Sequence, residues 1–127
     1  MFEENDIVAE PEKAYDIKHR VYAFSKNIVT YVGTAKFDKI YCSIFDQLLR
    51  SATSVGANLV EARAGASKKD FLKFYAIALK SANETKYWLC LVRDTIETDK
   101  GKIKEMLAEA NEISKIIAKI IISAKED

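Results

Sequence analysis

The chain has 127 residues, with 20 Lys and Arg against 19 Asp and Glu, and this length fits one domain that buries a core without disulfides or a metal. Only four Gly and one Pro leave little material for turns, which excludes a many-stranded β protein and favours a few long helices. No apolar run approaches about 18 residues, and the start, MFEENDIVAEPEK, is acidic, so we expect no transmembrane span, secretory signal or membrane partner.

The first twelve residues differ in charge from the rest of the chain, since they contain no lysine or arginine. Their five acidic side chains are Glu3, Glu4, Asp6, Glu10 and Glu12. We expect residues 1–12 to form an acidic, partly disordered leader and residues 13–127 to form the folded domain. Without the leader the chain has 20 basic and 14 acidic residues, a charge of +6, which would attract nucleic acid or an acidic protein mildly.

Two helices are predicted in the first half of the folded domain. From Ala14 to Tyr31 apolar residues recur at alternating steps of three and four, the spacing of one helix face. Gly33 is placed to cap the end of this helix. The same pattern runs from Tyr41 to Ala62, with Asp38 as the expected N-cap and Gly65 as the expected stop.

Two more helices are predicted in the second half. Ser67 begins the capping-box sequence SKKD, which opens a helix whose apolar stripe runs from Phe71 to Val92. Thr98 or Asp99 is expected to cap the last helix, with a stripe from Ile103 to Ala124. Four long amphipathic helices joined by short loops predict an all-α, antiparallel up-down-up-down four-helix bundle with shallow crossing angles.

Some apolar residues of the last two helices lie outside the core stripes. At about 100° per residue they widen the apolar faces of both helices. Either a broad monomer core or a second copy of the chain would cover them, and we predict self-association. The candidate oligomer contacts are Ile77, Tyr87, Trp88, Leu91, Ile116 and Ile122.

No set of residues in the sequence predicts catalysis. His19 is the only histidine, and with Asp16 it would form half of a di-iron motif whose second half is missing. Cys42 and Cys90 have no CxxC partner, so we expect two reduced, buried thiols in a cytoplasmic protein. The sequence has no phosphate-binding glycine loop and no metal-ligand cluster. We therefore expect no enzyme, no cofactor, no metal and no small-molecule substrate.

Basic residues gather around the start of the third predicted helix. Lysines at a helix N-terminus interact unfavourably with the helix dipole, which indicates that they have a role other than stabilising the helix. A solvated face is the competing interpretation, and repetition around a symmetric oligomer would strengthen the patch. The candidate nucleic-acid patch comprises Arg63, Lys68, Lys69, Lys73 and Lys80.

A polar stripe follows the second predicted helix through RSATSVGANLVEARAG, residues 50–65. It begins at the edge of the core, and small residues such as Gly56 allow a neighbouring backbone to approach closely. We interpret it as a seam between helices where Arg50 pairs with Glu84 or Glu61, and a plain solvent face is the alternative. Its predicted members are Arg50, Ser51, Asn58, Glu61, Ser81 and Glu84.

Three blocks of sequence stand out as a group. They are QLLRSATSVGANLVE at 47–61, SKKDFLKF at 67–74 and IALKSANE at 77–84. Together they resemble the 23S rRNA intervening-sequence proteins, also called four-helix bundle proteins, and similarity in character extends from about Tyr15 to the end. By this resemblance, the family's characteristic polar positions are Arg50, Asn58, Glu61, Ser81 and Glu84.

The resemblance implies a small cytoplasmic bacterial bundle that forms a pentameric ring and has no catalytic activity. It also implies kinship with the accessory protein of diversity-generating retroelements, which binds a reverse transcriptase and nucleic acid. We therefore expect a non-enzymatic homo-oligomer, a pentamer by resemblance, that binds RNA or a ribonucleoprotein. The alternative is a protein adaptor or scaffold with no nucleic-acid contact.

Overall fold

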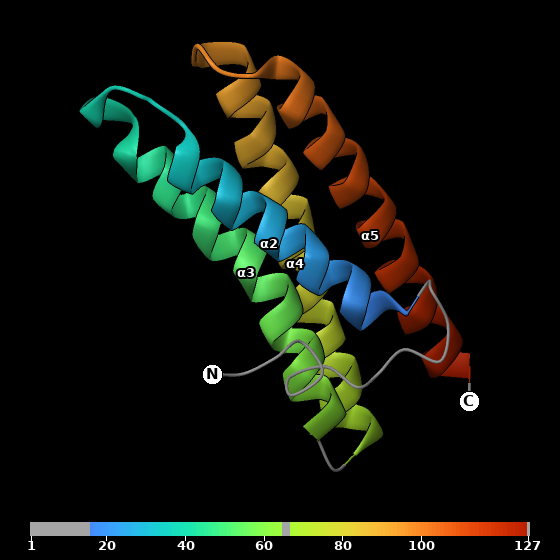
Figure 1. Cartoon of the computed structure of the whole chain (residues 1–127). Helices are drawn as coiled ribbons and strands as arrows, with labels where there is room; N and C mark the ends of the chain where they lie inside the picture. The colour runs from blue at the N-terminus through green and yellow to red at the C-terminus, as the bar shows by residue number, and fades with distance from the viewer. Residues whose placement is uncertain (1–15, 65–66, 127) are drawn as a thin grey trace.

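The computed structural model describes residues 16–64 and 67–126, and in these residues the chain forms four α-helices and one short 3-10 turn (Figure 1). The elements are α2 (Ile17–Thr34), η1 (Lys39–Tyr41), α3 (Cys42–Ala64), α4 (Lys68–Thr95) and α5 (Lys100–Glu126). Successive helices run in opposite directions, so the predicted antiparallel up-down-up-down bundle is confirmed. The predicted leader and Gly65 lie outside the described residues.

One apolar face of every helix contributes to a continuous core. Its fully buried members include Ile28 of α2, Leu48 of α3, Leu89 of α4 and Ile117 of α5. Within each helix the buried residues recur at the predicted steps of three and four, because that spacing keeps side chains on one side of a helix. No helix in the described part of the chain is long and apolar enough to cross a membrane.

The core differs from the predicted stripes at the starts of α3 and α4. Phe45 and Tyr75 are buried, whereas Ile44 and Phe74, their predicted neighbours in the stripes, are only half-buried. In α3 the reason is local: η1 precedes the helix, and the ring of Phe37 in the connection stacks on Phe45 with a centroid distance of 3.9 Å.

Short polar side chains cap the helix starts as expected. The side chain of Asp38 accepts a hydrogen bond at the start of η1, and Ser67 Oγ accepts one from the amide of Asp70 at 3.1 Å. Asp99, the second of the two predicted caps for the last helix, accepts from the amide of Lys102 at 3.0 Å. Each bond satisfies a backbone donor that has no partner within its helix.

The end of α2 is different from the prediction. Gly33 lies inside the helix, which continues to Thr34, and none of the glycines in the described residues has a positive φ. Ala35 takes the C-cap position in extended conformation, and its amide donates to the carbonyl oxygen of Tyr31 at 2.8 Å. Gly33 as C-terminal cap was therefore wrong, because an extended cap needs no left-handed residue.

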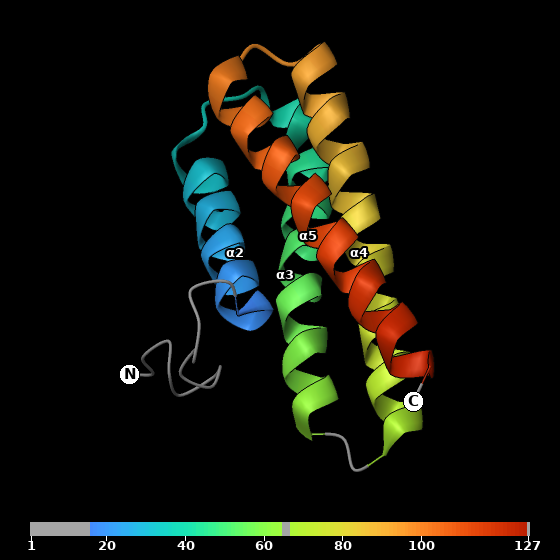
Figure 2. The same ribbon diagram turned by 90° about the vertical axis from the view of Figure 1, so that its right-hand side faces the viewer.

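The first helix, α2, is the shortest of the four and begins part of the way along the bundle, so α3, α4 and α5 continue past its first turn (Figure 2). The guanidinium of Arg20 fixes α2 to α5 by donating to both carboxylate oxygens of Glu109 at 2.7 and 2.8 Å. This hydrogen bonding raises the pKa of Arg20. At the other end, the hydroxyls of Tyr31 and Thr98 lie 2.5 Å apart.

Candidate functional site

Hydroxyl groups line the contact between α3 and α4. Ser81 Oγ lies 2.9 Å from Ser54 Oγ, and Thr85 Oγ1 lies 3.0 Å from Ser51 Oγ. Asn58 Nδ2 donates to the carbonyl oxygen and the hydroxyl of Ser54 at 2.8 and 3.0 Å. Three predicted seam residues, Ser51, Asn58 and Ser81, are thus placed where the two helices meet. We use the name hydroxyl seam for the five side chains of Ser51, Ser54, Asn58, Ser81 and Thr85.

The three charged members of the predicted seam lie outside it. Arg50 is exposed and its Nε donates to Asp46 Oδ2 on its own helix at 3.2 Å, so the expected pairing with Glu84 or Glu61 was wrong. Glu84 accepts from Trp88 Nε1 at 3.1 Å, and Glu61 is exposed. Arg50 and Glu84 thus find partners four residues away, because such side chains are neighbours on a helix surface.

Replacing Thr85 with valine is expected to lower the free energy of unfolding by about 1–2 kcal/mol, since the buried hydroxyl bonds to Ser51 and to the Ser81 carbonyl. Urea unfolding followed by circular dichroism measures the change. Thr53→Val is the matched control, because this hydroxyl is exposed and bonds only to carbonyls of its own helix. The control should change the free energy by less than about 0.5 kcal/mol. Equal losses in both variants would show that the hydroxyl bond between α3 and α4 adds no more stability than a hydroxyl bond within one helix.

A hollow of about 460 Å³ lies where the end of α3 and the start of α4 meet the first turn of α2. Lys18, Arg63 and Lys68 bring one positive charge each from three different helices, and Phe71 and Tyr75 add aromatic surface. Burial, followed by the nearby Asp16 carboxylate, raises the pKa of Tyr75 above its ordinary value. We call this site the basic hollow.

The predicted nucleic-acid patch divides into two parts. Arg63 and Lys68 line the basic hollow, whereas the other three lysines are exposed and lie within about 40° of one another around α4. The Lys73 ammonium lies 5.2 Å from the centre of the Phe74 ring. The predicted patch did not include Lys18, because only the packing of α2 beside α3 brings it to the hollow. The lysine stripe of α4 comprises Lys69, Lys73 and Lys80.

The six predicted oligomer contacts differ in exposure. Tyr87 and Ile122 are each 60% exposed and Ile77 is 37% exposed, whereas Trp88, Leu91 and Ile116 are half-buried. The Tyr87 ring packs edge-on against Trp88 with a centroid distance of 5.0 Å. By helix geometry, four of these residues fall on one side of α4 together with Glu84. This outer face of α4 comprises Ile77, Tyr87, Trp88 and Leu91.

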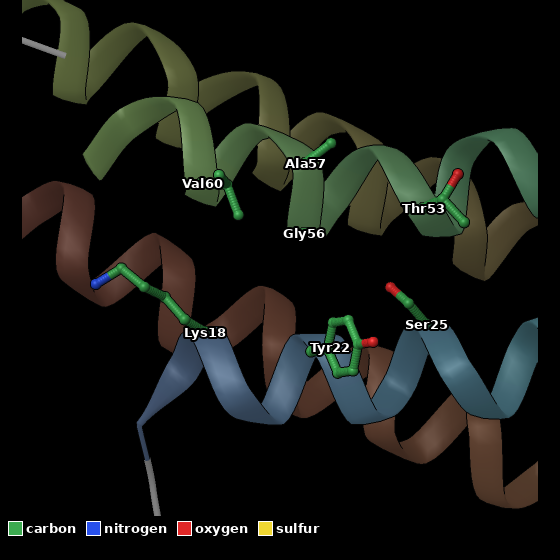
Figure 3. A pocket seen from close by; sticks show the side chains of 7 residues that line it. All are labelled: Lys18, Tyr22, Ser25, Thr53, Gly56, Ala57 and Val60. Carbon is green, nitrogen blue, oxygen red and sulfur yellow. The ribbon is translucent and has the colours of Figure 1, made fainter. Parts of the chain in front are cut away.

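A second hollow, of about 240 Å³, lies between α2 and α3 and was not predicted from the sequence (Figure 3). Gly56 lies at its floor, where an added Cβ would be 3.3 Å from Val21 Cγ1 and 3.8 Å from Ser25 Oγ. The small residue anticipated at the seam therefore admits α2 rather than α4. The hollow is lined by Lys18, Tyr22, Ser25, Thr53, Gly56, Ala57 and Val60.

The reactive side chains are dispersed. Cys42 is exposed and Cys90 is half-buried, both as thiols, so the expectation of two buried cysteines was wrong. Asp16 caps α2 by accepting from the amide of Lys18 at 2.9 Å. In residues 16–64 and 67–126, no group of three or more His, Cys, Asp and Glu side chains is arranged to hold a metal ion.

The described residues define an all-α four-helix bundle with a hydroxyl-lined contact between α3 and α4 and a basic hollow at one end. The chain belongs to the family of 23S rRNA-intervening sequence proteins, whose family model matches residues 12–119, so the resemblance inferred from the sequence is confirmed. The chain is similar to the crystal structure of a Bacteroides thetaiotaomicron protein of unknown function from the S23 ribosomal protein family, with a TM-score of 0.74 and 34% sequence identity. The match covers 84% of this chain and 98% of that one. None of the curated proteins matches the chain.

Proposed function

We propose that the protein is a non-enzymatic, self-associating bundle that binds RNA through the basic hollow. The observation that carries the proposal is the convergence of Lys18, Arg63 and Lys68 from three helices on one hollow. Cations at such a site contact phosphates, and an aromatic ring beside them, here Phe71, offers a surface for an unpaired base.

Fluorescence anisotropy with a labelled, structured RNA tests this function at about 50 and 200 mM salt. If three cations each neutralise one phosphate of a duplex, the higher salt weakens binding about 40-fold, because every phosphate contact releases counterions. Absence of binding at the lower salt would overturn RNA as the partner. Co-purification of a protein partner in that case would favour an adaptor with no nucleic-acid contact.

Self-association is proposed to use the outer face of α4, where Tyr87 and Ile77 expose apolar surface beside Trp88. We expect light scattering to give a mass several times the chain mass of 14.3 kDa, with a pentamer as the state that the family resemblance favours. The double variant Ile77→Glu/Trp88→Glu should shift the mass toward the monomer, since it places charges in an apolar contact.

The control for this experiment is Ile40→Glu, because Ile40 is 74% exposed and lies in η1, outside the proposed contact face. It should leave the mass unchanged. Circular dichroism should show unchanged helix content in both proteins. A monomer mass for the unmodified chain at micromolar concentration would contradict self-association.

A further inference from the structure

We propose that the acidic leader, residues 1–12, docks across the basic hollow of its own chain and competes there with polyanions. The inference rests on the proposed function because it adds a regulator to the same site. The leader precedes α2, whose first turn carries Lys18 at the rim of the hollow. The leader is therefore tethered next to the three cations.

Charge is the first argument for this occupant. The leader carries five carboxylates and no lysine or arginine, whereas the hollow gathers cations from three helices. A carboxylate beside Lys18, Arg63 or Lys68 would form a charge-assisted contact of the kind that an RNA phosphate would form. The two ligands therefore compete for the same donors.

Reach is the second argument. A twelve-residue segment spans at most about 40 Å when extended, which allows it to cross a hollow that begins at its point of attachment. A short tether also gives the segment a local concentration in the millimolar range, so weak individual contacts suffice for docking. At the end of the bundle where α2 begins, α3, α4 and α5 extend past its first turn.

Zero-length cross-linking with a carbodiimide tests docking without RNA. This reagent joins a carboxylate to a lysine amine only when the two are in contact. We expect cross-linked peptides between residues 1–12 and Lys18 or Lys68 by mass spectrometry, and loss of these products at about 1 M salt, where charges are screened. The internal controls are Lys36 and Lys39, two exposed lysines in the connection between α2 and α3.

Three outcomes of the cross-linking are decisive. Products at Lys68 within one chain support the proposal, whereas products at Lys18 do not decide it, because Lys18 lies only six residues after Glu12. Equal yields at Lys36 and Lys39 would overturn it, because they would indicate random encounters. Mixing ¹⁵N-labelled and unlabelled protein identifies the donor chain, and products that join only different chains would overturn docking in the same chain.

RNA binding gives a second readout. The variant has neutral amides at the five acids, Glu3→Gln, Glu4→Gln, Asp6→Asn, Glu10→Gln and Glu12→Gln. It should bind RNA at least about threefold more tightly than the unmodified chain, since removal of a competitor raises the fraction of open sites. Unchanged affinity in a protein that binds RNA would overturn the competition. If the unmodified chain binds no RNA, the proposed function fails, and cross-linking still decides whether the leader docks.

Discussion

Replacing Phe45 with alanine should lower the free energy of unfolding by about 3–5 kcal/mol. Phe45 is 2% exposed, and its ring stacks on Phe37 at 3.9 Å and lies 6.2 Å from the ring of Tyr31. Truncation removes this apolar contact and leaves a cavity in the aromatic cluster, which the surrounding helices fill only in part. Urea unfolding followed by circular dichroism measures the loss.

Ile40→Ala is the control for Phe45, since Ile40 is a large apolar residue only five positions earlier that is 74% exposed. Its replacement should change the free energy of unfolding by less than about 0.5 kcal/mol. A loss below about 1 kcal/mol for the Phe45 variant would show that the aromatic cluster does not stabilise this end of the bundle.

Reversing two charges of the basic hollow, with Arg63→Glu/Lys68→Glu, should weaken RNA binding at least about tenfold at low salt. The double variant removes two phosphate contacts and places two carboxylates beside the RNA. It should also reduce the slope of log affinity against log salt by about 1.8 for a duplex. Anisotropy titrations over a series of salt concentrations give both values.

The matched control is Lys36→Glu/Lys39→Glu, which changes the net charge by the same amount in the connection between α2 and α3, at the opposite end of the bundle (Figure 1). Binding should fall much less in this variant. Equal weakening by the two double variants would show that net charge, rather than the basic hollow, governs the affinity. Circular dichroism should confirm that both variants retain their helices.

Periodicity was sufficient to predict the four helices and most of their buried faces. Residues such as Val21, Leu48 and Leu89 recur at helical spacing, and the structure buries all three. Phe45 escaped this reasoning because its burial depends on Phe37, which lies in the connection before α3 and has no helical period. Gly33 was misjudged because glycine favours a left-handed helix end without requiring one.

The candidate site was less accessible to sequence reasoning than the fold. The positions of Ser51 and Asn58 around their helix indicated that both lie at the edge of the core. The structure agrees, because Ser51 contacts Thr85 of α4 and Asn58 contacts Ser54 of its own helix. Arg50 was assigned the wrong partner, because a pattern along one helix gives no distance to the next. Lys18 lines the basic hollow only because α2 packs beside distant segments of the chain, and residue spacing along the sequence does not predict that packing.

The hydroxyl seam sets a size limit on sequence variation in this bundle. Four small side chains of this seam bond to one another across α3 and α4, and threonine is the largest of them: Ser51, Ser54, Ser81 and Thr85. A longer side chain there would force the helices apart or into strained rotamers, at a cost of about 1–3 kcal/mol per site. Natural diversity at these positions should therefore be confined to residues no larger than threonine or valine.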